Sequence, residues 1–279
     1  MKTLLGILLL LALTNLTANA VVINKSLTLP AEGLKELTID CGAGFLKVEG
    51  SDNLSEIRVE AEIIIEGLSE DETVEFLERH VELSLKERGN KAYLKSHIEN
   101  PGEFFSSLMS GSRGQQINLT VQMPSNLDLD VDDGSGFIEI RNIGGELDLD
   151  DGSGEMTIRN IRGDVDIDDG SGTATVEEVG GDLDFTDGSG DLEIVNISGS
   201  AEINDGSGSI IIRGVKGDVF IDDGSGELRV ERITGNVRIN DGSGSIYVED
   251  VDKDVTIVEA GSGSVHIANV RGKVYHEDD

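Results

Sequence analysis

An aspartate opens a repeated Asp-Gly-Ser-Gly motif at seven positions, each 18 residues after the one before. These are Asp133, Asp151, Asp169, Asp187, Asp205, Asp223 and Asp241. If the repeats stack as β-coils, neighbouring carboxylates lie about 4.8 Å apart and repel each other by about 1 kcal/mol in water. A cation could relieve this repulsion, and carboxylate oxygens are ligands that calcium prefers. The aspartate ladder is therefore a candidate cation site.

The same motif is also typical of a turn. Its two glycines permit positive φ, and its aspartate and serine can hydrogen-bond to nearby backbone groups. Calcium-binding β-rolls have coils of the same length, but their G-G-x-G-x-D motif is absent from this sequence. We therefore expect turn formation as the main role of the motif and no cofactor, and we keep calcium as the alternative that the ladder permits.

Each repeat contains two alternating runs of five residues between turn residues. In the copy that begins at Asp151, the runs are 155–159 and 164–168. Alternation with period two is typical of half-buried strands. In the aligned copies, five columns of mostly aliphatic side chains begin at Ile138, Ile140, Ile143, Leu147 and Leu149. The sequence thus predicts an all-β parallel β-solenoid of eight coils over residues 126–279, wound to the right.

The outward positions between these columns differ from coil to coil. One outward column runs Asp148, Asp166, Asp184, Glu202, Phe220, Arg238, Thr256 and Tyr275. It contains no regular threonine row of the kind that favours ice binding. Because its acidic residues belong to the early coils, one end of one sheet is the expected place for a cationic partner.

The first 20 residues have the features of a secretory signal peptide. Lys2 precedes an apolar run, and Ala18-Asn19-Ala20 precedes the expected cleavage site. The run is too short to span a bilayer, so we expect an exported protein of the periplasm, the cell surface or the extracellular space, without a transmembrane segment. Cys41 is the only cysteine, so no internal disulfide is possible. A formal net charge of −33 excludes nucleic acid as a partner.

The region between the signal peptide and the repeats divides into two parts. Residues 21–50 are interpreted as the first strands and a founding coil, with Gly42-Ala43-Gly44 in place of Gly-Ser-Gly. Residues 51–125 are interpreted as an insertion that caps the solenoid as a small α+β unit. Its helix is predicted from a capping box of Ser69 and Glu72. Its strands are predicted at Glu56–Ile65, Glu82–Lys86, Lys91–Ile98 and Ile117–Met123.

Apolar side chains also occur in a predicted loop of this insertion. They are Phe104, Phe105, Leu108 and Met109, with glycine and serine on both sides. Packing against the cap is one interpretation of these residues. The alternative is a loop that contacts a partner or a membrane.

The sequence lacks the usual signatures of catalysis. Its four histidines, His80, His97, His266 and His276, lie in three separate regions without the spacing of metal ligands. No G-x-S-x-G, phosphate-binding loop, H-E-x-x-H or C-x-x-C motif occurs. The turns keep one length across the repeats, which leaves no long loops to build a cleft. We therefore predict that the protein is not an enzyme.

Several segments together resemble a bacterial β-strand-repeat family of unknown function whose members are described as candidate adhesins. They are the signal peptide, the founding coil GAGFLKVEG, the insertion ending in INLTVQMPSNLDLDV, and the repeated GSG coils with a G-D-V-D-I half. The resemblance implies a single-stranded β-helix in the cell envelope and brings no catalytic residues.

These observations predict a non-enzymatic exported scaffold or adhesin-like binding protein of the bacterial cell envelope. We expect a monomer with a protein or glycan partner that the sequence does not identify. Two alternatives stay open: a periplasmic regulatory or sensing partner of a membrane system, and a calcium-stabilised extracellular β-roll. Cell fractionation separates the first alternative from surface adhesion, and melting with calcium or chelator tests the second.

Overall fold

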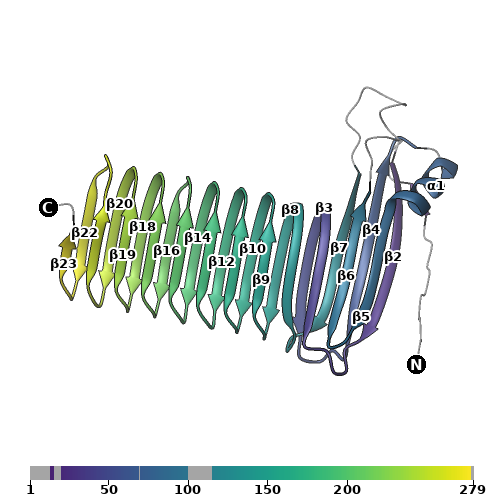
Figure 1. Cartoon of the computed structure of the whole chain (residues 1–279), viewed down its shortest axis with the longest axis horizontal. Helices are drawn as coiled ribbons and strands as arrows, with labels where there is room; N and C mark the ends of the chain where they lie inside the picture. Colours follow the sequence, from purple (N-terminus) through teal and green to yellow (C-terminus); the bar gives the residue numbers. More distant parts are fainter. Residues whose placement is uncertain (1–12, 16–19, 69, 100–114, 278–279) are drawn as a thin grey trace. The chain divides into compact units, whose positions relative to one another are not determined.

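The computed structural model describes residues 13–15, 20–68, 70–99 and 115–277 (Figure 1). The chain forms two compact units, Met1–Phe137 and Ile138–Asp279. Among the described residues, no helix is both long enough and apolar enough to cross a membrane.

The second unit is a parallel β-solenoid, which confirms the predicted fold. Its short strands are β9 (Leu147–Asp151), β11 (Val165–Asp169), β13 (Leu183–Asp187), β15 (Ala201–Asp205), β17 (Val219–Asp223), β19 (Val237–Asp241), β21 (Val255–Glu259) and β23 (Val274–His276). Its other strands are β10 (Gly154–Ile161), β12 (Gly172–Val179), β14 (Gly190–Ile197), β16 (Ile210–Val215), β18 (Gly226–Ile233), β20 (Gly244–Val251) and β22 (Val265–Val270). The two kinds of strand alternate along the chain and form two parallel ladders (Figure 1).

The register of the ladders follows the sequence repeat. Val165 pairs with Leu147 on one side and with Leu183 on the other, each 18 residues away. The register shifts between Ile239 and Asn240, where β21 takes in one extra residue. This irregularity is the structural counterpart of the single 19-residue spacing in the sequence. The right-handed winding stays a prediction.

The core of the solenoid consists of the five predicted columns. Met156, Ile158 and Ile161 represent the columns of the longer strands, and each is at most 1% exposed. Val165 and Ile167 represent those of the short strands and are 2% and 0% exposed. Because each coil buries its inner face only against its neighbours, the stack stabilises all of its members together.

Close stacking at one corner requires glycine. Gly190 has φ of +155°, and a Cβ at this position would overlap the carbonyl oxygen of Gly172 in the preceding coil. A side chain here would push adjacent coils apart. The Gly-Ser-Gly part of the motif therefore provides both the backbone conformation and the close approach.

The first unit is built mainly of strands. They are β1 (Leu13–Asn15), β2 (Ala20–Pro30), β3 (Glu36–Ser51), β4 (Glu56–Glu66), β5 (Val81–Arg88), β6 (Lys91–Ile98), β7 (Gln115–Pro124) and β8 (Asp128–Ile143), the last of which continues into the second unit. β4 lies between β2 and β7 and is antiparallel to both. The two halves of β3 pair in parallel with β6 and with β7. The predicted strands of the insertion all occur, and β6 has the predicted bounds.

The predicted helix of the insertion is also present. Helix α1 spans Glu70–His80 and ends where β5 begins at Val81. Phe76 is completely buried and Thr73 is 1% exposed, whereas Val74 is 56% exposed. The buried face of the helix is thus formed by Phe76 and Thr73.

Candidate functional site

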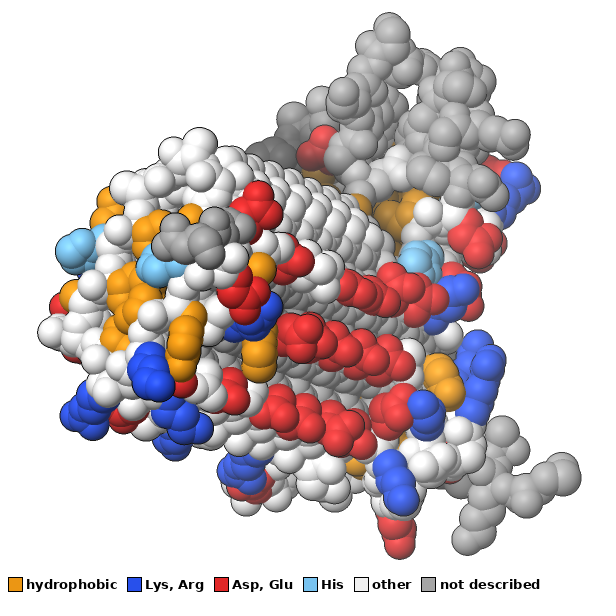
Figure 2. All heavy atoms as spheres, turned by 60° about the vertical axis from the view of Figure 1, so that its left-hand side comes forward, with side chains coloured by type: hydrophobic (Ala, Val, Ile, Leu, Met, Phe, Trp, Pro, Cys, Tyr) orange, Lys and Arg blue, Asp and Glu red, His pale blue; other side chains and the backbone are white. Residues whose placement is uncertain are grey.

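Acidic side chains cover the outer face of four short strands of the solenoid. Alternation along β9, β11, β13 and β15 turns every second side chain outward. We call the six outward acidic residues of these strands the acidic face. They are Asp148, Asp150, Asp166, Asp168, Asp184 and Glu202, and all six are exposed. The parallel register brings Asp166 beside Asp148 and Asp184, so the acidic residues form rows along the stack (Figure 2).

The strands of the acidic face contain no residue that could neutralise it. No lysine or arginine occurs in β9, β11, β13, β15 or β17. Arg238 in β19 is the first basic residue of this ladder, and its guanidinium binds both carboxylate oxygens of Glu277 at 2.9 and 3.3 Å. The negative charge is therefore concentrated at one end of the sheet, as the sequence predicted.

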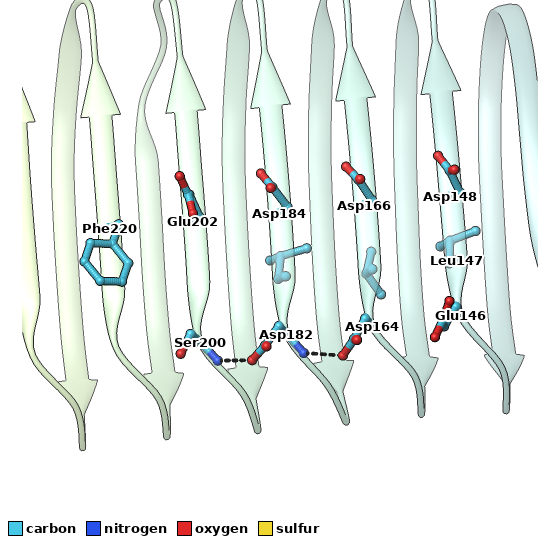
Figure 3. Close-up of a pocket in the computed structure, with 12 residues that line it drawn as sticks. Glu146, Leu147, Asp148, Asp164, Asp166, Asp182, Asp184, Ser200, Glu202 and Phe220 are labelled. Atoms are coloured by element: carbon cyan, nitrogen blue, oxygen red, sulfur yellow. Dashed lines mark hydrogen bonds between the residues drawn. The ribbon is translucent and has the colours of Figure 1, made fainter.

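The acidic face is slightly hollowed. Its side chains line a shallow hollow of about 480 Å³ that extends from Glu146 to Phe220 (Figure 3). Phe220 lies in register with Glu202 and is 43% exposed, although it is a large apolar side chain. The hollow thus combines a long acidic floor with one aromatic end.

Acidic side chains at the turn beside the hollow have a structural role. Asp164 Oδ1 accepts the backbone N–H of Asp182 at 2.9 Å, and Asp182 Oδ1 accepts that of Ser200 at 2.7 Å (Figure 3). Each side chain thereby binds the backbone of the next coil. We therefore do not count this turn column as part of the acidic face.

The rows of the acidic face raise the pKa of their own members. Burial, followed by the charges of Asp184, Asp168 and Asp150, raises the pKa of Asp166. Burial, followed by the charges of Glu202 and Asp168, raises the pKa of Asp184. Ionising these groups together opposes their mutual repulsion, and a cationic ligand would relieve it.

The structure brings the aspartates of the predicted ladder together inside the coils. Asp169 pairs in register with Asp151 and Asp187. All seven ladder residues, Asp133, Asp151, Asp169, Asp187, Asp205, Asp223 and Asp241, are between 0% and 5% exposed. Among the described residues, no group of three or more histidine, cysteine, aspartate or glutamate side chains is arranged to hold a metal ion. The calcium alternative stays a prediction.

Cys41 lies within the first unit beside Asp133. Its thiol donates to Asp133 Oδ1 at 3.1 Å, and burial, followed by the charge of Asp133, raises the pKa of the thiol. His97 contacts Asp40, the residue before Cys41, and not the thiol. A thiol that is kept protonated is a poor nucleophile, so this group of residues favours structure over catalysis.

The predicted partner-contact loop cannot be placed in this site. Phe104, Phe105, Leu108 and Met109 lie outside the residues that the structure describes. The exposed aromatic residue that the structure adds is Phe220. Its place in the outward column beside four acidic residues was visible in the sequence, but its neighbourhood to the hollow was not.

Comparison with known proteins identifies relatives at the level of family and fold. Residues 56–278 match the family model Toastrack DUF4097. No curated protein matches the chain. A solved structure described as a "putative cell adhesion protein", from Clostridium sporogenes, is 14% identical over 88% of this chain and 99% of its own, with a TM-score of 0.28. Another, described as a "putative adhesin" from Parabacteroides distasonis, is 15% identical over 91% of this chain and 96% of its own, with a TM-score of 0.37.

Proposed function

The chain belongs to the Toastrack DUF4097 family, and from this premise we propose that it is a non-enzymatic, adhesin-like binding protein of the bacterial cell envelope. Its acidic face is the proposed binding surface, and a cationic protein segment is the proposed ligand. The single observation that carries the proposal is the concentration of six outward carboxylates on four adjacent strands without a basic residue among them.

A comparison of coils within the chain supports this assignment. The outward position occupied by Asp148, Asp166 and Asp184 in the early coils is occupied by Phe220 and Arg238 in later ones. The later coils keep the same register and the same buried columns. An acidic residue is therefore not required at this position for a coil to fold, so the acidic rows serve another purpose.

The dimensions of the acidic face indicate the size of the ligand. Four strands about 4.8 Å apart span about 14 Å, which is the length of four or five residues of an extended chain. Lysine or arginine side chains of such a segment would lie over the carboxylate rows. Phe220, at the end of the face, offers an apolar contact for a hydrophobic residue of the same segment.

Calorimetric titration with a short oligolysine peptide tests this surface. We expect binding that weakens as salt is added, because exposed charge pairs are screened. The double variant Asp166→Asn/Asp184→Asn should weaken binding by about threefold to thirtyfold, at roughly 0.3–1 kcal/mol for each exposed pair. Phe220→Ser should leave oligolysine binding unchanged but weaken the binding of a lysine peptide that ends in phenylalanine.

The matched control changes the same charge on the other ladder. Glu155→Gln/Glu227→Gln removes two exposed carboxylates from β10 and β18. If this variant weakens binding as much as the first one, only the net charge matters and the acidic face is not the binding surface. Fractionation of cells tests the proposed location: recovery in the cytoplasm would contradict a role in the envelope.

A further inference from the structure

The aspartates of the repeat motif form a column that faces the interior of the solenoid. Each stands last in a short strand with the burial pattern buried, exposed, buried, exposed, buried, so it points inward like the aliphatic residue two places before it. The column in the second unit consists of Asp151, Asp169, Asp187, Asp205, Asp223 and Asp241, and we call it the inner aspartate column. Carboxylates in such positions normally need a partner of opposite charge.

Only one oxygen of each carboxylate has a clear role in the turn. Asp205 Oδ1 accepts the backbone N–H of Ser207 at 3.1 Å, and the other five members accept the corresponding serine N–H at 2.9 to 3.2 Å. The second oxygen, Oδ2, has no hydrogen-bond partner and almost no accessible surface in Asp169, Asp187, Asp205, Asp223 and Asp241. A sphere of the size of a water molecule therefore cannot touch it.

The charged groups around the column are acidic as well. Asp205 of β15 is flanked in register by Asp187 of β13 and Asp223 of β17, and Asp191 of β14 adds a further negative charge. Asp223 is influenced by Asp205, Asp241 and its neighbour Asp222. The other inward side chains of these coils, such as Ile203 and Ile212, are aliphatic. No cationic side chain acts on these two carboxylates.

The possible ligands of Oδ2 differ in the room that they need. A metal ion needs several oxygen ligands and a space of its own, and a water molecule needs at least its own volume. A proton needs neither, and it removes the buried charge together with the repulsion between neighbours. We propose that the inner aspartate column is a proton-binding element, in which several carboxyl groups stay protonated at mildly acidic pH and release their protons towards neutral pH.

The titration properties of the column agree with this geometry. Burial is the largest cause that raises the pKa of Asp169, Asp205 and Asp223 to about 6. Burial also raises the pKa of Asp187 and Asp241. Because the members repel one another, their protons leave in coupled steps, and the stack is weakened as the charge accumulates.

Nuclear magnetic resonance of the full chain, labelled at the aspartate carboxyl carbons, tests the proposal. We expect a group of resonances that titrates with midpoints near 6, well above those of ordinary aspartates, which lie near 4. Midpoints near 4 for every carboxyl group would overturn the proposal, and this reading needs no variant. A group that loses its high midpoints on addition of calcium, and regains them with chelator, would also overturn it in favour of a bound cation.

Two adjacent residues of β11 provide a matched pair of variants. Asp169 points inward and Asp168 points outward. Asp169→Asn should remove one resonance from the group with high midpoints, whereas Asp168→Asn should leave the number in that group unchanged. Loss of a high-midpoint resonance in Asp168→Asn instead would assign the protons to the surface and overturn the proposal.

Discussion

Replacing Asp223 by asparagine will make the stability of the protein less dependent on pH. Burial, followed by the charge of Asp205, raises the pKa of Asp223 from 3.8 to about 6. Between these two values the folded protein keeps a proton that the unfolded chain has released. The stabilisation by this group is therefore complete below about pH 4 and is lost as the pH rises through about 6.

The magnitude follows from the difference between the two pKa values. About two units at about 1.36 kcal/mol each give a loss of roughly 3 kcal/mol in the free energy of unfolding between acidic and neutral pH. Asparagine keeps an oxygen for the N–H of Ser225, which Asp223 accepts at 3.0 Å, but it has no charge to titrate. Its buried amide donor destabilises the fold at every pH, so only the change with pH reports the missing charge.

Urea unfolding followed by circular dichroism measures this change. Between about pH 4.5 and about pH 7.5, wild type should lose roughly 3 kcal/mol more than Asp223→Asn does. Because solenoids can unfold in parts, hydrogen exchange of the β17 amides should be followed as well. Stability that changes equally with pH in wild type and variant would refute the assignment of the titrating charge to Asp223.

The neighbouring residue provides the control for net charge. Asp222 precedes Asp223 in β17 but points outward, and its charge is the smallest of the named causes that raise the pKa of Asp223. Asp222→Asn removes the same unit of charge from a chain with a net charge of −33. It should flatten the pH dependence only slightly. Equal flattening by both variants would show that overall repulsion, and not burial at the inner corner, governs the response.

Three further predictions concern the stack itself. Gly190→Ala will lower the melting temperature strongly, because its Cβ would overlap the carbonyl of Gly172, whereas Gly42→Ala, with a single ordinary contact, will have a small effect. Phe185→Ala will lower the free energy of unfolding by about 3–5 kcal/mol in urea titrations, because the completely buried ring leaves a cavity. The calcium alternative predicts a melting midpoint that is higher with calcium than with chelator, and an unchanged midpoint at low salt would reject it.

The solenoid was predictable because one pattern repeats many times. The alternation of residues 164–168 fits a strand, and the 18-residue period then fixes which residues are neighbours, such as Val165 and Leu183. The columns, the register and the outward acidic row all follow from these two numbers. Strand pairing is usually hard to infer from sequence, and here the repeat supplies it.

The inner position of the aspartates was not predicted. The motif Asp-Gly-Ser-Gly fits a turn, so its aspartate was assigned to the turn and not to the strand before it. Continuing the alternation from Val165 and Ile167 by one step would have placed Asp169 inside. The expectation that a charged residue avoids the interior outweighed a pattern that indicated the opposite.

The first unit shows what a single sequence does not reveal without a repeat. Its strands were predicted individually, because each has its own alternation or apolar run. The pairing of β3 with both β6 and β7 joins segments that are about 50 to 70 residues apart. No period links these segments, so the register depends on packing between side chains that local patterns do not specify.

A comparison between two columns of the same coils explains why the inner residue is aspartate. At the turn column, the acceptor for the next backbone N–H is Asp182 in one coil, Ser200 in the next and Asn236 further on. Where only an oxygen is needed, the chain thus replaces aspartate freely by neutral residues.

The inner corner also needs only an oxygen, for the serine N–H, and asparagine or serine could provide it without burying a charge. Yet aspartate occupies the inner corner of every short strand from β9 to β19. What a carboxyl group can do there, and an amide or hydroxyl group cannot, is to gain and lose a proton in this pH range. The invariance of the inner aspartate within one chain is therefore best explained by its titration and not by the turn that it begins.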